Sequence, residues 1–279
     1  MFISNPLDNH PFIRTQSTEE FREALGQIYA KPKMQLAPST KIFNAYINNC
    51  DLRHISLAYG AYNSAMRLEF PAVNRFIQLT PIRGKGEISS GRNSASLTTN
   101  MSVIISPDTG YMANYADNRE QLALKIDARA LTDKLAALTG ATISQPLRMD
   151  LQADFTRPTA RALHDYLPVL VNTLSAAEAP LPDWWIAQIE QFVMVMFLFA
   201  YRHNYSHLLE RKLPDVSFRQ VRLAEEYIEA NSQQPVTLET LAEVSGVCAF
   251  DLCRAFQKFR GCSPIEFASW VRSTRKGRQ

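Results

Sequence analysis

Apolar and polar residues alternate with a period of two through much of the segment between residues 50 and 127. The alternation runs through Ile55, Leu57 and Tyr59, through Met66, Leu68 and Phe70, and over Phe76–Ile82, Ser102–Ser106 and Gln121–Asp127. Glycine and proline lie between these stretches, and no helical pattern separates them. This spacing is typical of short antiparallel strands, so we predict an antiparallel sandwich or a small barrel over about residues 50–155, and we favour a jelly-roll barrel.

Helical patterns flank this segment. A short helix is predicted around Ser17–Tyr29, and another over Ala128–Leu138, ending at Gly140. Two longer helices are predicted over Arg157–Ala176 and Asp183–Leu209, and the short connection between them favours an antiparallel helical hairpin. The second long helix is apolar on several sides. We expect one side to cover the barrel and the remainder to form a homodimer interface.

From Ser217 onward the pattern is helical. A helix with one apolar face is predicted over Phe218–Asn231. Thr237 is a suitable N-cap for a short helix over Leu238–Ser245, and Gly246 permits a tight turn before the next helix, Ala249–Arg260. Two short helices joined by a glycine-containing turn make a helix-turn-helix, whose second helix enters the major groove of DNA.

Composition adds a charge asymmetry to this pattern. The 279 residues are enough for about two domains. The net charge is only +3, but beyond Leu252 the chain carries seven Lys and Arg against one acid, Glu266. The positive charge is therefore concentrated beside the predicted helix-turn-helix. The 4 cysteines form no C-x-x-C pair, which indicates free thiols in a reducing compartment.

Targeting and metal signals are weak. The N-terminal residues show no signal-peptide pattern, and the longest apolar run, Phe192–Tyr201, is about half the length of a membrane helix. We therefore expect a cytoplasmic protein without a membrane partner. His203, His207 and Glu210 have a helical spacing that a metal site can use, but we interpret them as a solvated helix end. No nucleophile-elbow, P-loop or dinucleotide motif occurs, so we expect no metal, no cofactor and no catalytic residues.

A specific resemblance covers Thr237–Arg272, which reads TLETLAEVSGVCAFDLCRAFQKFRGCSPIEFASWVR. It resembles the first helix-turn-helix of the AraC/XylS family of bacterial transcription regulators. The positions in register are Leu241, Ala242, Gly246, Val247, Leu252, Arg254, Phe256, Gly261, Ser263, Pro264, Phe267 and Arg272. The strand-rich segment is similar to that family's cupin-like effector-binding domain at His54–Gly60, Pro81–Gly84 and Ile105–Pro107.

The resemblance implies an α+β chain with three parts. Residues 1–155 form a cupin-like effector domain, residues 156–212 a helical hairpin for dimerisation, and residues 217–279 an all-α helix-turn-helix domain that binds double-stranded DNA. Two features depart from the family pattern. The sequence stops at Gln279, so we expect the family's second helix-turn-helix to be missing and DNA discrimination to be weak. Cys248 stands where the family usually has a Ser or Thr N-cap, and a thiol accepts hydrogen bonds poorly.

The second helix of the motif supplies the expected DNA contacts. The family's base-contacting positions correspond to Phe250, Cys253 and Arg254, and Gln257 faces outward beside them. Arg254 has the geometry to pair with guanine, or it contacts only phosphate. Three further residues of the basic segment are expected at phosphates, which position a protein without specifying sequence: Lys258, Arg260 and Arg272.

The effector is expected inside the barrel, and the family suggests a small organic acid. The predicted lining consists of Tyr59, Tyr62, Leu68, Phe70, Phe76 and Leu124. Arg83 either meets an anionic group at the barrel mouth or belongs to an exposed charged turn. The leading hypothesis is therefore a ligand-responsive transcription regulator. Two alternatives remain: a cupin-type enzyme with a helical accessory domain, and a ligand-binding regulator fragment that does not bind DNA productively.

Overall fold

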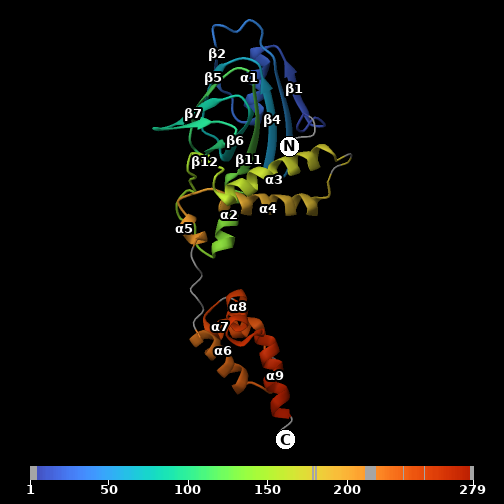
Figure 1. The fold of residues 1–279 in the computed structure, drawn as a ribbon, viewed down its shortest axis with the longest axis vertical. Helices are drawn as coiled ribbons and strands as arrows, with labels where there is room; N and C mark the ends of the chain where they lie inside the picture. Colours follow the sequence, from blue (N-terminus) through green and yellow to red (C-terminus); the bar gives the residue numbers. More distant parts are fainter. Residues whose placement is uncertain are drawn as a thin grey trace. The chain divides into compact units, whose positions relative to one another are not determined.

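The structure is a computed structural model that describes residues 5–177, 179, 181–210, 218–234, 236–247 and 249–276, with residues 250, 275 and 276 described by their backbone alone. The chain forms two compact units, residues 1–209 and 210–279 (Figure 1). The first unit contains the described strands together with the helical hairpin, and the second unit is helical.

Two antiparallel sheets form the body of the first unit. The larger sheet has the order β1 (Pro11–Thr15), β3 (Ala45–Asp51), β4 (Ile55–Tyr62), β11 (Arg119–Asp127), β6 (Arg75–Arg83), β9 (Met101–Ile105) and β12 (Gln152–Asp154). The smaller sheet has the order β2 (Lys33–Leu36), β5 (Met66–Phe70), β10 (Tyr111–Tyr115), β7 (Gly86–Ser90) and β8 (Asn93–Leu97). The predicted α+β class is confirmed.

The strands form two facing sheets, as in the sandwich alternative, and the favoured barrel is not closed. The larger sheet ends in β1 and β12 and the smaller in β2 and β8, and no ladder among the described strands joins these edges. The sheets are held by apolar packing between them. The shared core contains Leu68, Leu79, Ile88, Val103 and Ala123, all at most 2% exposed.

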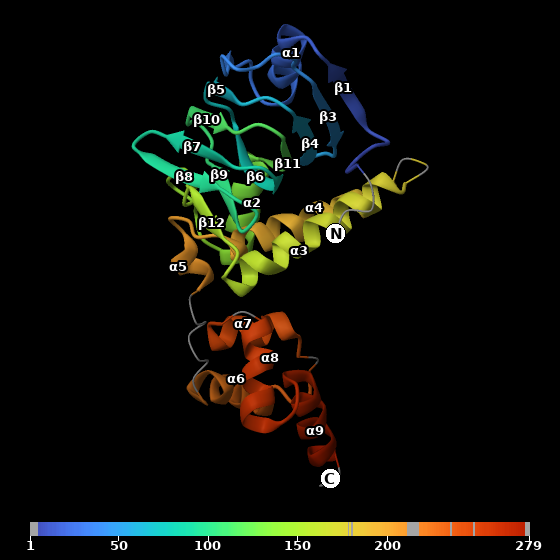
Figure 2. The ribbon, with the colours of Figure 1, turned by 45° about the horizontal axis from the view of Figure 1, so that its top comes forward.

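Helices cover the other face of the larger sheet (Figure 2). They are α2 (Ala128–Thr139), α3 (Pro158–Ser175) and α4 (Asp183–Ala200), and the short α5 (Ser206–Leu209) lies beside α2 and α4. A second core on this side includes Leu122 of β11, Leu163 of α3 and Phe197 of α4. The central strands β4, β11 and β6 are therefore buried on both faces. The remaining helix, α1 (Thr18–Ile28), starts at the N-cap Ser17 and buries Phe21 in the core between the sheets.

The second helix of the hairpin is shorter than predicted. α4 ends at Ala200 because Tyr201 has an extended backbone, and the chain then crosses beside Met149 through an isolated bridge at His203. His203 is 6% exposed, and its Nε2 lies 3.2 Å from the carbonyl oxygen of Leu198. The interpretation of His203 as part of a solvated helix end is therefore wrong.

A buried carboxylate ties α4 to the larger sheet. Glu190 is 1% exposed and accepts hydrogen bonds from the backbone N–H groups of His54 and Ile55, the latter at 3.1 Å. These two groups lie at the start of β4, where antiparallel pairing leaves donors without a strand partner. A carboxylate that accepts two backbone N–H bonds is a strong, charge-assisted connection. Glu190 thus fixes where the hairpin meets the sheet.

A buried lysine ties α1 to β11. Lys125 is 2% exposed, and its Nζ donates to Asn49 Oδ1 at 3.1 Å and to the carbonyl oxygen of Ile28, the last residue of α1, at 3.3 Å. Burial lowers the pKa of Lys125 to about 8, opposed by the charge of Asp51. The lysine therefore retains a proton at neutral pH at a cost, because desolvation disfavours its charged form.

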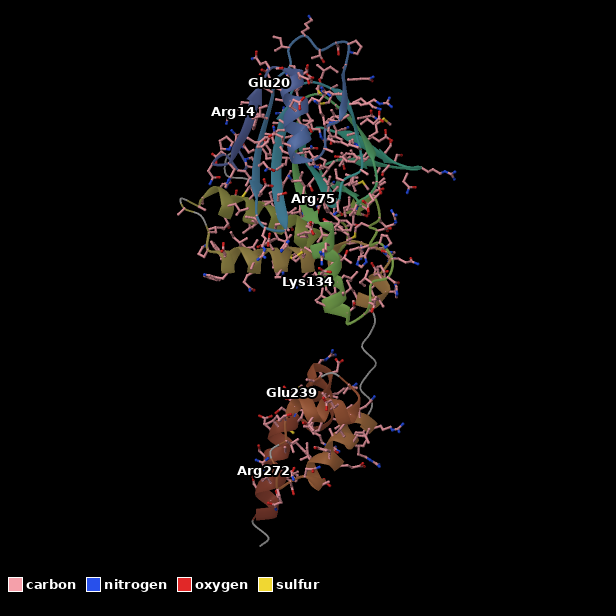
Figure 3. All side chains as sticks on the ribbon, turned by 180° about the vertical axis from the view of Figure 1, so that it is seen from behind. Arg14, Glu20, Arg75, Lys134, Glu239 and Arg272 are labelled. Atoms are coloured by element: carbon pink, nitrogen blue, oxygen red, sulfur yellow. The ribbon has the colours of Figure 1, made fainter. Side chains whose placement is uncertain are left out.

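The second unit consists of α6 (Phe218–Ala230), α7 (Leu238–Ser245), α8 (Ala249–Arg260) and α9 (Pro264–Lys276). Its core contains Val221, Ala224, Leu241, Leu252 and Phe256. The bounds predicted for α7 and α8 are confirmed. Thr237 caps α7 by accepting a hydrogen bond from the N–H of Thr240, and Gly246 ends it with a φ of 69°. Figure 3 labels Glu239 on α7 and Arg272 on α9.

Glu190→Ala should lower the free energy of unfolding of the first unit by about 2–5 kcal/mol, because two buried N–H groups lose a charged acceptor. Urea denaturation followed by tryptophan fluorescence measures this loss. Gln188→Ala, an exposed position on the same helix, is the control and should change stability by about 0.5 kcal/mol or less. Equal stabilities for the two variants would contradict the role given to Glu190.

Lys125→Met should change how stability depends on pH. Between about pH 8 and 10.5 the unfolded lysine keeps its proton while the folded lysine loses it. The unfolded state then binds more protons, so this lysine makes stability rise with pH in that window. Urea unfolding at both ends of the window should show a more positive slope for the natural chain than for Lys125→Met. Parallel slopes would mean that Lys125 titrates normally.

Candidate functional site

The space between the two sheets is largely filled by side chains. Tyr62, Leu68 and Phe70 of the predicted effector lining lie there. The cavity that they line is ≈ 20 Å³, room for about one water molecule. Three of its walls come from α1 and the residue after it: Phe21, Leu25 and Tyr29. An organic effector therefore fits between the sheets only after α1 or neighbouring side chains move.

The other apolar residues predicted to line the interior lie on the opposite face. Tyr59, Phe76 and Leu124 belong to the core between the larger sheet and the helices. This placement corrects the sequence prediction. Tyr59 and Tyr62 are three residues apart on β4, so a strand must point them to opposite faces. Central strands of the larger sheet are buried on both faces, so apolar residues point to both sides of each strand. The sequence pattern therefore does not tell which of them face the space between the sheets and which face the helices.

A fully buried arginine, which the sequence analysis missed, lies at one end of β11. Arg119 is 0% exposed, and its Nε and Nη2 donate to Gln121 Oε1 at 3.2 and 3.1 Å. Its Cζ lies 4.4 Å from the ring centroid of Tyr115. Its Nη1 has no hydrogen-bond partner, and no ion pair with a described acid is present. No local signal pointed to Arg119, because the sequence analysis placed Leu124 in the interior and Arg119 lies at the opposite phase of the same strand.

Tyr62 belongs to the same buried cluster. Its ring stacks on Tyr115 with centroids 5.7 Å apart, and its hydroxyl is buried without a hydrogen-bond partner. Burial raises the pKa of Tyr62 well above its usual value, although the positive charge of Arg119 and the nearness of its guanidinium to the Tyr62 hydroxyl oppose that shift. The two side chains thus lie side by side, but not in the geometry of a hydrogen bond. The hydroxyl therefore stays protonated and keeps its hydrogen available for donation.

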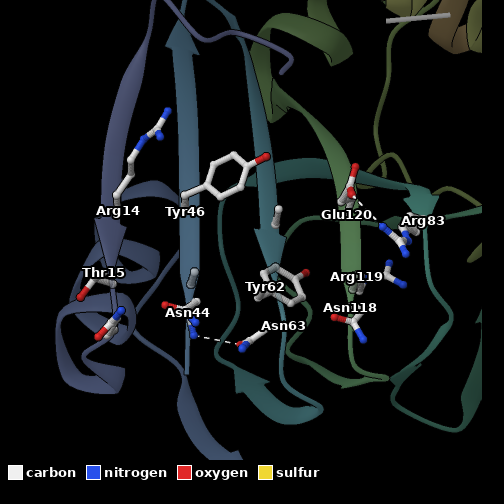
Figure 4. Close-up of a pocket in the computed structure, with 13 residues that line it drawn as sticks. Arg14, Thr15, Asn44, Tyr46, Tyr62, Asn63, Arg83, Asn118, Arg119 and Glu120 are labelled. Carbon is white, nitrogen blue, oxygen red and sulfur yellow. Dashed lines mark hydrogen bonds and ion pairs between the residues drawn. The ribbon is translucent and has the colours of Figure 1, made fainter. Parts of the chain in front are cut away.

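An open cleft of ≈ 540 Å³ lies at this end of the larger sheet (Figure 4). Arg14, Tyr46, Arg83 and Glu120 line it together with Tyr62 and Arg119. Arg83 is exposed and lies 3.9 Å from Glu120, whose carboxylate also accepts a 2.9 Å hydrogen bond from the Tyr59 hydroxyl. Tyr62 lines both this cleft and the small cavity between the sheets, so it separates the two.

The predicted DNA-contacting residues of α8 gather on one side of the helix. Arg254, Gln257 and Lys258 are exposed, and Cys253 is half-buried. Gln257 follows Cys253 by four residues and Lys258 follows Arg254 by four residues, so the two pairs lie on adjoining turns of the helix. The side chain of Phe250 lies outside the described residues, as does Cys248. The exposed surface of α8 is therefore polar and basic, whereas Leu252 and Phe256 face the core.

Two arginines predicted at phosphates have partners within the unit. Arg260 pairs with Glu225 of α6 through Nε at 2.5 Å and Nη2 at 3.0 Å, and this pairing raises the pKa of Arg260. Arg272 donates to the carbonyl oxygen of Gln234 at 3.3 Å. The sequence analysis expected both at phosphates and did not foresee that both also connect elements of the second unit. The partner of Arg260 lies 35 residues away in the sequence and that of Arg272 lies 38 residues away, so the spacing of residues within one helix did not reveal either contact.

Within the part of the chain that the structure describes, no group of three or more His, Cys, Asp or Glu residues is arranged to hold a metal ion. None of the described helices is long and apolar enough to cross a bilayer. The candidate sites are therefore the buried arginine with its adjoining cleft and the exposed side of α8.

Comparisons with known proteins identify the family to which this chain belongs. The family described as AraC-binding-like domain matches residues 21–198. The "Probable thc operon regulatory protein" of Rhodococcus erythropolis is 31% identical over 201 residues, 69% of this chain but only 59% of that protein's length. The crystal structure of the AraC-like transcriptional activator CuxR has a TM-score of 0.54 and 14% identity, with 96% of this chain and 94% of that chain covered, which is a likeness of fold. The chain belongs to the AraC-binding-like domain family, and its resemblance to AraC-type regulators is confirmed.

Proposed function

We propose that this protein regulates transcription by binding double-stranded DNA through α7 and α8 and a small organic effector through its first unit. The observation that carries the proposal is the exposed basic side of α8. α8 comes after the capped helix α7 and the turn at Gly246, which is the order of elements in a helix-turn-helix. The proposal assigns no catalytic residue, metal or cofactor.

In this proposal α8 enters the major groove. Arg254 is exposed and can present two parallel N–H groups to the O6 and N7 atoms of guanine. Cys253, Phe250 and Gln257 lie at neighbouring positions on the same helix and contact adjacent bases. Lys258 contacts phosphate, which positions the helix without reading sequence.

The effector part of the proposal rests on the family and on the arrangement of the first unit. The cleft of ≈ 540 Å³ at the end of the larger sheet shares the wall residue Tyr62 with the small space between the sheets. The cleft has the size of a usual small-molecule site, and the space between the sheets adds apolar walls next to it.

A homodimer interface on α4 is also part of the proposal. Trp184 is 70% exposed, and Phe192 and Phe199 are 49% and 46% exposed, although α4 packs its other side on the sheet. Val169 of α3, 57% exposed, adds to the apolar surface of the hairpin. A second copy of the chain provides a matching apolar surface through two-fold symmetry.

Arg254→Ala should remove sequence discrimination. Duplexes enriched from a random pool by the full chain supply the preferred site, and fluorescence anisotropy measures its affinity. The variant should bind that site about 5- to 150-fold more weakly while its binding to unrelated duplex changes little. Lys258→Ala should weaken binding to both duplexes and lower the salt dependence.

Arg219→Ala is the matched control, because it removes one exposed charge of the second unit outside α8. It should preserve the preference for the selected site. Failure of the natural chain to enrich any sequence, or an equal effect of Arg254→Ala on both duplexes, would contradict the assignment of α8 as the DNA-reading helix.

Phe199→Glu should convert a dimer to a monomer, because a charge placed at an apolar interface loses its hydration without gaining a partner. Light scattering at micromolar protein gives the mass, and circular dichroism checks that the variant folds. Ala137→Glu, which adds a charge at an exposed position of α2 outside the hairpin, should remain dimeric. A monomeric natural chain under these conditions would refute the interface.

A further inference from the structure

Arg119 holds a positive charge where the fold offers no countercharge. The side chain is 0% exposed, and its two hydrogen bonds go to the neutral amide oxygen of Gln121. An arginine does not lose its proton inside proteins, so it cannot relieve the cost of burial by becoming neutral. Buried charges are normally paired with an opposite charge. The face of the Tyr115 ring, 4.4 Å away, offers only a partial compensation.

Some hydrogen-bond donors of this buried cluster have no acceptor. Nη1 of Arg119 carries two N–H groups without an acceptor, and the Tyr62 hydroxyl is a second buried group without a partner. Both groups have hydrogens to donate, and both belong to residues that line the cleft. The complementary ligand group is therefore an anion that only accepts hydrogen bonds.

We propose that Arg119 and Tyr62 bind the carboxylate of the effector, so that the effector is an organic acid with an apolar body. The inference rests on the proposed function, in which the first unit binds a small effector. A carboxylate is planar and carries one negative charge, which matches the single buried guanidinium. The proposed contact neutralises Arg119 and gives Nη1 and the Tyr62 hydroxyl acceptors.

The apolar body of the acid lies between the sheets. Next to Tyr62 the cavity is lined by Leu68, Phe70, Leu79 and Tyr111, and the rings of Phe70 and Tyr111 are stacked with centroids 4.7 Å apart. The present volume of ≈ 20 Å³ must grow for an acid larger than a few atoms. A shift of α1, which contributes Phe21 and Leu25 to the walls, enlarges it without separating the paired strands.

The cleft is the route by which a ligand reaches Arg119 from solvent. Arg14 and Arg83 lie at its walls and Glu120 is the acid among them, so the lining residues carry more positive than negative charge. An anion is therefore attracted toward Arg119 before it meets the buried donors. A neutral ligand can accept hydrogen bonds from these donors through a carbonyl oxygen, but it brings no charge to balance Arg119, and a cationic ligand is repelled by it.

Arg119→Met in the full chain tests whether the buried charge of Arg119 serves to bind a ligand or to stabilise the fold. Methionine fills similar space without charge, so the variant without ligand should unfold at a higher temperature than the natural chain. If the arginine serves only to hold Gln121 and Tyr115 in place, the variant should unfold at a lower temperature, which would overturn the inference. Arg83→Met, which removes an exposed arginine from the same cleft, is the control and should leave the unfolding temperature nearly unchanged.

Ligand class is tested with paired probes, each acid against its primary amide: benzoate and benzamide, phenylacetate and phenylacetamide, hexanoate and hexanamide. Differential scanning fluorimetry at millimolar ligand should show the best acid raising the unfolding temperature by about 2 °C or more, with its amide inactive. Arg119→Met should weaken binding of that acid by about 10- to 100-fold. No effect of any acid, or an equal effect on Arg119→Met, would overturn the inference.

DNA selection separates this inference from the proposed function. Arg119→Met should enrich the same duplex sequence as the natural chain when no acid is present, because α8 is unchanged. If the natural chain enriches no duplex but still binds acids through Arg119, the proposed function fails and the carboxylate site stands. If both chains select one duplex and neither responds to an acid, only the carboxylate site fails.

Discussion

The first unit depends on β11, a strand that is paired along both edges and buried on both faces. β4 and β6 pair with it antiparallel, one core lies on the side of the smaller sheet, and the other lies on the side of the helices. Its side chains must therefore alternate between two interiors. A slip of one residue would move Arg119 and Lys125 against the helices and Leu122 between the sheets. This constraint fixes both the core packing and the position of the candidate effector site.

The helices of the second unit were predictable because their signals are local. The Thr237 cap and the positive φ at Gly246 lie within one turn of the helix ends that they specify. The apolar positions of α8 then repeat at helical spacing, which fixes the side of the helix that faces solvent. Contacts between helices carry no such signal. Arg260 looked like a free cation because its partner, Glu225, lies on a helix 35 residues earlier.

Strands of the first unit were predictable where they are apolar, but their faces were not. β4, β6 and β11 are buried on both sides, so period-two alternation does not tell which core a residue enters. Tyr59 and Tyr62 illustrate the ambiguity. β3 escaped notice because the buried Asn48 interrupts the apolar pattern that marks a strand. β10 was also missed, although Tyr111, Ala113 and Tyr115 alternate with the less buried Met112 and Asn114. Their place in the sheets is decided by long-range pairing.

Two cations on β11 show why a buried charge alone does not identify a binding site. Lys125 donates to two neutral oxygens, and burial lowers its pKa to about 8, so the fold can accommodate it with or without its proton. Arg119 has no such freedom, since a guanidinium remains charged at every pH a protein tolerates. An added anion would supply the missing countercharge, because no acid among the described residues pairs with Arg119 and its Nη1 has no hydrogen-bond partner. The same strand thus holds one cation that serves the fold and one that is suited to a ligand.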